Sequence, residues 1–481
     1  MSFGRALGVL ALFAACAPAP ASPRVAGAPA RVASPAPAAP AKTSRTRDAC
    51  TYHVAVSTPS PLVVSVQARC EAAGVTGFAP ADPAILGFVS REGAPDARPP
   101  FPATHPAPGL AELTYDVDLD GLARRADDID TARRFGSSVL APASSFLLAP
   151  DPPVDGLPVH VVFDTPGIET GLRVDAGGDY IIESHELAVA TYTAFGVREA
   201  RDIAVGAATV RLAVLDGKLD LPVDELARWV TDAAGGVAAF FGRPPEARTL
   251  VVLGPVRGRH GVPFGKLLPE SAPGVVILVG EHTRSAELHD DWVLVHELFH
   301  VGTPSYLGEG KWYDEGLATY FEPLIRLRLG WRTEADLWSE FARDMPRGLD
   351  AMTRRGLVQP ETYSDVYWGG GLFCLLADVA VRRASGGARG LEDGVRAVFE
   401  AGGIASEVWS LARTTEITDQ ALGAPILAEL ELAHLERGSP VDLDGLLRAL
   451  GVVRGKQGRV VLDDTAPLAG LRRVLAYGGA R

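Results

Sequence analysis

The sequence predicts a multidomain α+β protein with a β-sandwich-like N-terminal domain, a mixed sheet-and-helix domain and a helical C-terminal region. The first observation is length, because 481 residues exceed what one compact core usually holds. The second is the order of patterns. Alternating or β-branched runs dominate residues 49–192, mixed strand and helix patterns occupy 193–330, and helical periodicity fills 331–437. Apolar and charged contents of 47% and 22% are ordinary for globular protein, so neither disorder nor a membrane bundle is indicated.

Residues 1–16 have the pattern of an export signal peptide. Arg5 gives a short positive region, and the apolar run at 6–15 is too short to span a bilayer. Segment 12–16, Leu-Phe-Ala-Ala-Cys, resembles a bacterial lipobox with Cys16 as the lipidated residue; the alternative is cleavage by an ordinary signal peptidase. Either route predicts an exported protein, lipid-anchored in the bacterial cell envelope or secreted. Membrane contact is expected only through the anchor at Cys16.

An Ala/Pro-rich tether, residues 17–48, precedes the N-terminal β domain, residues 49–192. Cys50 and Cys70 flank a strand-like region and could pair in an oxidising compartment. Cys374 lies in an apolar helical pattern and is most simply a buried small hydrophobe. Strands of the β domain are expected at Thr51–Ser57, Leu62–Gln67, Ala111–Val117, Val159–Phe163 and Asp179–Glu183.

Residues 193–330 combine apolar strands with amphipathic helices, 331–437 are helical, and 438–481 form a short C-terminal segment. The helix expected at Pro222–Phe241 opens with proline and is followed by glycine. The other elements expected here are strands Thr209–Leu215, Thr249–Leu253, Gly274–Val279 and Arg459–Leu462, and helices Leu372–Arg383 and Leu443–Leu450.

Residues 296–300 spell His-Glu-x-x-His, and Glu315 follows the second histidine by fifteen residues on another helical pattern. Residues four apart share one face of a helix, so His296 and His300 can direct two imidazoles at one cation. Glu297 is rotated by about 100° and can reach a water on that cation without being a ligand. A catalytic zinc site typically has two histidines and a carboxylate as ligands, with one coordination position left open for water. One zinc ion per chain is therefore expected.

This order of motifs resembles the gluzincin metallopeptidases, above all the aminopeptidase N-like and glycyl aminopeptidase-like families. The resemblance implies a thermolysin-like catalytic domain within 193–330. It also implies that His296, His300 and Glu315 are the zinc ligands and that Glu297 is the general base.

The resemblance also suggests three substrate contacts. These families use a tyrosine in a Tyr-x-x-Gly segment to stabilise the oxyanion, and Tyr367 begins such a segment; the alternative is a cleft-wall aromatic. Their aminopeptidases hold the substrate amine with a glutamate before the edge strand. The usual motifs are missing, and Glu270, just before Gly274–Val279, is the only stand-in; the alternative is a solvated loop carboxylate.

Strand Gly274–Val279 is expected to bind the peptide backbone. Asp314 and Thr319 are both candidates to support a histidine ligand.

The implied function is an exported zinc peptidase that uses a metal-activated water, with aminopeptidase action favoured over endopeptidase action. The fourteen residues between His300 and Glu315 are fewer than aminopeptidase N-like enzymes have, which shortens a loop at the cleft. Epoxide hydrolysis, a different reaction that the same fold can catalyse, is an alternative activity. The rival is a non-catalytic surface lipoprotein with this fold as a binding or scaffolding module, against which the intact Glu297 argues. A net charge of −13 argues against nucleic acid as a partner, and no signal for oligomeric state is present.

Overall fold

The computed structural model describes residues 48–91, 99–104, 109–189, 191–306, 308–455 and 458–478. The expected signal peptide, and the tether up to residue 47, lie outside the described residues. From Asp48 onward the chain forms one compact unit. Within the described ranges, no helix has both the length and the apolar character needed to cross a membrane.

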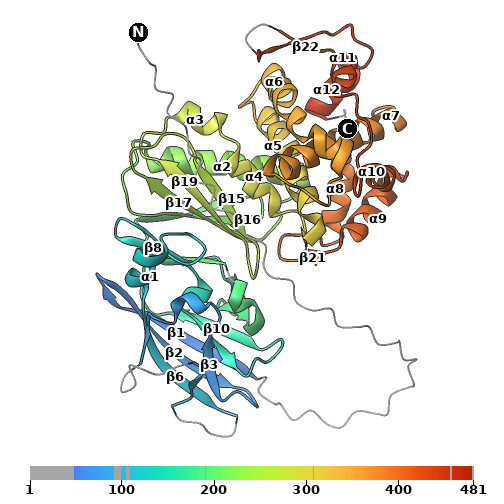
Figure 1. Cartoon of the computed structure of the whole chain (residues 1–481). Coiled ribbons are helices and arrows are strands. Elements are labelled where there is room, and N and C mark those ends of the chain that lie inside the picture. Colours follow the sequence, from blue (N-terminus) through green and yellow to red (C-terminus); the bar gives the residue numbers. More distant parts are fainter. Residues whose placement is uncertain are drawn as a thin grey trace, which may run out of the picture. The chain divides into compact units, whose positions relative to one another are not determined.

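The N-terminal part of the described chain contains a seven-stranded sheet of order β12-β13-β10-β1-β2-β6-β4 (Figure 1). β1 and β2 pair antiparallel, β6 extends β2, and β10 runs parallel to β1. Burial alternates along β2, so one face of the sheet meets the core, as alternating apolar residues predict. The strands are β1 (Ala49–Pro59), β2 (Leu62–Glu71), β4 (Val89–Ser90), β6 (Ala111–Asp118), β10 (Pro158–Phe163), β12 (Arg173–Val174) and β13 (Tyr180–Glu183).

A four-stranded sheet of order β11-β14-β8-β7 shares a core with the seven-stranded sheet. Tyr52, Val64 and Tyr115 of the first sheet belong to the same cluster as Val139 and Phe195 of the second. The β-sandwich-like prediction is therefore confirmed. The remaining elements of this region are β3 (Gly77–Pro80), β5 (Phe101–Pro102), α1 (Leu119–Ala126), β7 (Arg133–Phe135), β8 (Ser138–Pro142), β9 (Leu148–Asp151), β11 (Ile168–Thr170) and β14 (Tyr192–Phe195).

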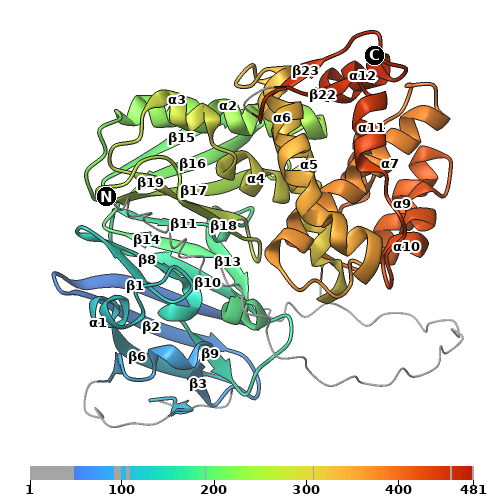
Figure 2. The same ribbon diagram turned by 45° about the horizontal axis from the view of Figure 1, so that its top comes forward.

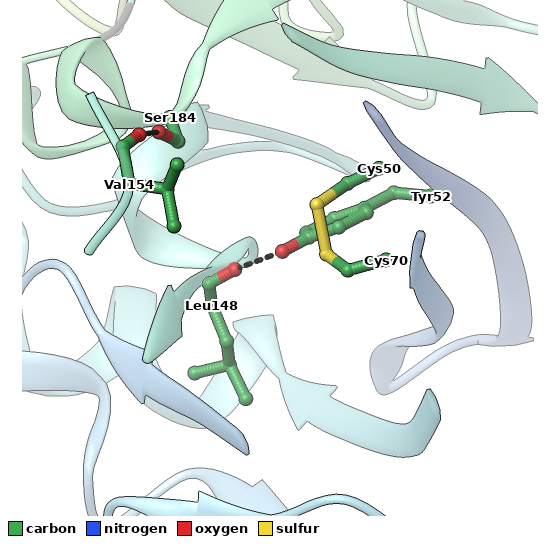
Figure 3. Close-up of a disulfide and its surroundings, with 6 residues drawn as sticks. All are labelled: Cys50, Tyr52, Cys70, Leu148, Val154 and Ser184. Atoms are coloured by element: carbon green, nitrogen blue, oxygen red, sulfur yellow. Dashed lines mark hydrogen bonds between the residues drawn. A yellow bond between two sulfur atoms is a disulfide. The ribbon is translucent and has the colours of Figure 1, made fainter. Parts of the chain in front are cut away.

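A disulfide joins Cys50 and Cys70 across the β1–β2 pair, which confirms the predicted pairing (Figure 3). Both cysteines are fully buried. Beside them the Tyr52 hydroxyl donates to the carbonyl oxygen of Leu148 at 2.7 Å and so ties the sheet to β9. Cys374 is free and buried, as expected.

A five-stranded sheet of order β15-β16-β17-β19-β18 follows (Figure 2). β16, β17 and β19 are mutually parallel, and β15 and β18 pair antiparallel at the two ends. Its inner strands are continuously apolar because both faces are covered, one by helices and the other by the four-stranded sheet. The strands are β15 (Glu199–Val205), β16 (Ala208–Val214), β17 (Arg248–Val256), β18 (Phe264–Leu268) and β19 (Gly274–Gly280).

The expected position of the edge strand is wrong. Strand β19, at Gly274–Gly280, pairs with β17 on one side and β18 on the other, so it is an inner strand. The edge is β18, Phe264–Leu268, which is partly exposed along its whole length. The apolar run at β19 reflects burial on both faces, which is the property of an inner strand. The expectation that Gly274–Val279 binds a peptide backbone therefore fails, because its backbone groups are already paired.

Helices dominate the chain after β19, as predicted, and Figure 2 shows α5 and α7 among them. A Cβ at Gly316 in α5 would lie 2.5 Å from the backbone of Gly370 in α7, so these helices meet through glycine. The helices are α2 (Val223–Phe241), α3 (Ser285–Asp290), α4 (Val293–His300), α5 (Lys311–Arg328), α6 (Glu334–Asp344), α7 (Gly370–Ala384), α8 (Leu391–Glu400), α9 (Leu411–Leu422), α10 (Ile426–His434), α11 (Leu443–Ala449) and α12 (Ala469–Tyr477). Short strands β20 (Ser305–Tyr306), β21 (Val408–Trp409), β22 (Val452–Arg454) and β23 (Val460–Leu462) complete the fold.

Replacing both Cys50 and Cys70 by serine should lower the free energy of unfolding by about 3 kcal/mol, because the disulfide closes a loop of sequence separation 20. Denaturant unfolding with and without a thiol reductant measures the effect. Cys374→Ala is the matched control, since it should keep the reductant sensitivity of the wild type. A reductant effect that persists in the double variant would contradict this assignment.

Candidate metal centre and active site

Helix α4 places two histidines in the interior. Just before the helix, the Asp291 carboxylate accepts the N–H of Val293 at 2.7 Å in a local turn. Apolar side chains such as Leu294 and Phe299 bury the opposite side of the helix. His296 and His300 are only 1% and 9% exposed. The helix ends at His300, just before Gly302 and Pro304, which are residues typical of a helix end.

The two histidines of α4 and Glu315 of α5 converge. The Nε2 atoms of His296 and His300 lie 3.2 Å apart, and they lie 3.1 and 3.5 Å from the same Oε2 atom of Glu315. Ligand atoms bonded at about 2.1 Å to one tetrahedral ion are about 3.4 Å apart. The three side chains predicted as ligands could therefore hold a single divalent ion, and their donor set fits zinc.

The electrostatics of this cluster favour an ionised carboxylate. Burial alone would raise the pKa of Glu315, but hydrogen bonds from His296 and His300 outweigh it and hold this pKa well below its usual range. Burial likewise opposes the charged form of His300, yet Asp314 and Glu315 raise the pKa of His300 well above its usual value. Glu315 is thus ready to act as an anionic ligand.

Asp314, rather than Thr319, contacts His300, one of the predicted ligands. Its Oδ1 atom lies 3.0 Å from Nδ1 of His300 and also accepts the Thr303 hydroxyl at 3.1 Å. Such a carboxylate fixes the orientation of an imidazole whose other nitrogen faces the metal. The Thr319 hydroxyl has no hydrogen-bond partner among the described residues. Thr303 was not among the predicted site residues, and the one available signal was its place three residues after His300.

Apart from the contact of its Nε2 atom with Glu315, His296 is contacted by aromatic rings. Its Nδ1 atom is buried and finds no hydrogen-bond partner in the described part of the chain. The Tyr367 ring stacks on the imidazole at a centroid distance of 5.8 Å, and Trp292 meets it edge-on at 4.9 Å. Tyr367 lies in a π-helical turn, Asp365–Gly369, so the structure brings this predicted residue to the cluster.

Glu297 is fixed against the edge strand. Its Oε2 atom accepts the backbone N–H of Leu267 in β18 at 2.9 Å. A Cβ at Gly265 would lie 2.3 Å from Cγ1 of Val293 and 3.0 Å from Cγ of Glu297, so only glycine permits this approach of α4 to β18. Burial raises the pKa of the Glu297 carboxyl. The contributions of Gly265 and Leu267 were not predicted, because β18 itself was not recognised.

Glu270 lies in the turn after the edge strand β18, not before it. Burial raises the pKa of the Glu270 carboxyl, and the negative charge of Glu186 raises this pKa further. The positive charge of Lys266 acts in the opposite direction. Among the described residues, no hydrogen bond or ion pair joins Glu270 to His296, His300 or Glu315. Its role as an amine anchor stays a prediction.

Comparison with known proteins supports the fold. No family model and no curated protein matches the sequence. An aminopeptidase N family protein from Idiomarina loihiensis is similar in structure, with a TM-score of 0.62 and 14% sequence identity over 84% of this chain and 78% of that chain. A mutant two-domain M1 zinc metallopeptidase bound to L-arginine aligns with a TM-score of 0.49 and 16% identity over 82% of this chain and 94% of that chain. The first similarity confirms the predicted fold.

Replacing Asp314 by alanine should weaken zinc binding by roughly 10- to 100-fold, because His300 loses the group that orients it. Competition with a chromogenic chelator measures the affinity. Thr319→Ala is the matched control on the same helix and should bind zinc as the wild type does. Equal affinities for Asp314→Ala and wild type would contradict this role.

Proposed function

We propose that this chain is an exported zinc-dependent peptidase that hydrolyses peptide bonds with a metal-activated water, with aminopeptidase action favoured. The observation that carries the proposal is the convergence of His296, His300 and Glu315 beside Glu297, which is itself held on an exposed sheet edge. A structural zinc site needs no carboxylate base beside its ligands.

His296, His300 and Glu315 would hold the zinc ion, with Asp314 orienting His300. When bound, zinc would polarise the scissile carbonyl and acidify the attacking water. The remaining requirements of hydrolysis fall to side chains and backbone of this chain.

Glu297 would take a proton from the attacking water and pass it to the leaving amine. Two features suit it to this task. Its bond to the Leu267 N–H fixes the orientation of the carboxylate, and burial raises its pKa, which makes the ionised form a stronger base. Tyr367, stacked beside His296, would donate its hydroxyl to the developing oxyanion.

The open edge of β18 would align the peptide backbone. The Leu267 N–H points toward α4 and away from β19. Residues two apart in a strand direct their backbone groups to the same side, so the backbone groups of Gly265 also point away from β19. An extended substrate can add to this side as a further strand. This role moves from Gly274–Val279, which the sequence suggested, to Phe264–Leu268.

Export is supported by the signal-like residues 1–16 and by the buried Cys50–Cys70 disulfide, since disulfides persist in oxidising compartments. The rival proposal, a non-catalytic binding module, gives no reason for the Glu297–Leu267 bond next to three potential ligands.

Glu297→Gln should retain about one zinc ion per chain and lose roughly 100- to 10,000-fold in kcat, because the base is removed while the ligands stay. Metal analysis and mass-spectrometric assay of a peptide library measure the two properties. A variant that cleaves peptides at the wild-type rate would refute the catalytic assignment. A zinc-loaded wild type that cleaves none would favour the binding module.

Gly265→Ala should reduce kcat/KM by at least about tenfold with zinc content unchanged, because the new methyl group displaces β18 from Glu297. Steady-state kinetics and metal analysis provide the test. Gly235→Ala in α2 is the control, since a Cβ there meets nothing within 4 Å. Similar kinetics for both variants would show that the close approach is unimportant.

Aminopeptidase action predicts that peptides with free N-termini are cleaved faster than their acetylated counterparts, and that Glu270→Gln reduces this preference. Paired assays of the two substrate forms measure it. Equal cleavage of both forms by the wild type would indicate endopeptidase action and remove the amine-anchor role of Glu270.

A further inference from the structure

We infer that Trp292 is a specificity-determining residue, whose exposed indole packs against a large apolar side chain of the substrate next to the scissile bond. The inference rests on the proposed peptidase function and adds a substrate class to it: peptides with an aromatic or similarly bulky apolar residue flanking the cleaved bond.

Trp292 immediately precedes α4, and its carbonyl oxygen accepts the backbone N–H of His296 at 3.1 Å. It precedes His296 by four residues, which places both side chains on one face of the helix. Their ring centroids are 4.9 Å apart with an interplanar angle of 86°. Successive residues of an extended peptide are about 3.3 Å apart. A side chain adjacent to a bond cleaved beside His296 can therefore reach the indole.

Exposure distinguishes Trp292 from its neighbours. Its side chain is 40% exposed, whereas Val293, Leu294 and Val295 are at most 5% exposed. All seven tryptophans lie in the described ranges, and Trp292 is the most exposed among them, while the others are buried or partly buried. Aromatic side chains commonly line ligand-binding sites, and this ring is open beside the potential metal ligands.

The groups around Trp292 favour an apolar substrate side chain over a charged one. The Asp291 carboxylate is engaged by the N–H of Val293, and the second aromatic beside His296 is Tyr367. Two rings thus flank the imidazole from different elements. Flat rings of this kind prefer aromatic side chains through edge-to-face and offset contacts.

The alternative is that Trp292 only shields His296. The two roles differ in their dependence on substrate. A shield acts on every substrate equally, whereas a contact with the substrate side chain changes the ratio of kcat/KM values between substrates.

The test uses the full-length zinc-loaded protein and matched peptides that carry Phe or Ala on either side of the cleaved bond. The wild type should prefer Phe at one of these positions. Trp292→Ala should lower the Phe-to-Ala ratio of kcat/KM by at least about tenfold, and Trp292→Phe should keep most of it. Tyr477→Ala, which removes a 56% exposed aromatic of α12, should leave the ratio unchanged.

A second measurement is independent of turnover. Calorimetry in the Glu297→Gln background should show that Trp292→Leu, which keeps apolar bulk, still weakens binding of the Phe peptide more than that of the Ala peptide. Equal losses for both peptides, with zinc content retained, would overturn the inference in favour of shielding. A wild type that cleaves peptides without preference would overturn it while leaving the peptidase proposal intact. A wild type that cleaves none would overturn both.

Discussion

The contact between α4 and β18 is the constraint on which the candidate site depends. One hydrogen bond, from the Leu267 N–H to Glu297, joins the helix that carries both histidines to the sheet edge that is open to a peptide. The absence of a side chain at Gly265 makes the contact possible. The proposed base and the proposed backbone-binding edge are thus fixed relative to each other before any substrate would bind, which is the preorganisation that catalysis requires.

Glu315, the third proposed ligand, is positioned by helix packing on the far side of the cluster. Glu315 lies on α5, and Gly316 brings α5 against α7. Further along α5, Tyr320 donates to the buried Asp378 of α7 at 2.8 Å, and Arg326 donates to the carbonyl oxygen of Asp290 in α3 at 3.2 Å. Buried polar groups are costly to leave unpaired, so these bonds resist sliding or rotation of α5. A rotation of one residue would turn Glu315 away from the histidines.

The predictable part of the site is the part that helix periodicity determines. His296, His300 and Glu297 follow from spacing along one helix, and the pattern around Glu315 marks a second helix. The edge strand β18 escaped prediction because Phe-Gly-Lys-Leu-Leu has no clear alternation, and a strand is an edge only through its pairing. The choice of Asp314 over Thr319 likewise depends on how α5 turns toward α4. Interactions between elements, unlike those within one element, leave little trace in local sequence.

The same argument assigns the N-terminal β domain a structural part in the site. Phe264 and Leu268 of β18 pack against the cluster that contains Ile129 and Phe135, on the face of the five-stranded sheet opposite α4. Lys266 forms an ion pair with Asp130 at 2.6 Å, and Arg211 of the sheet forms a bidentate pair with Glu169. Both pairs join the sheet to the β domain. A catalytic domain without this support would expose the apolar residues of its sheet and leave β18, which holds Glu297, supported on one face only.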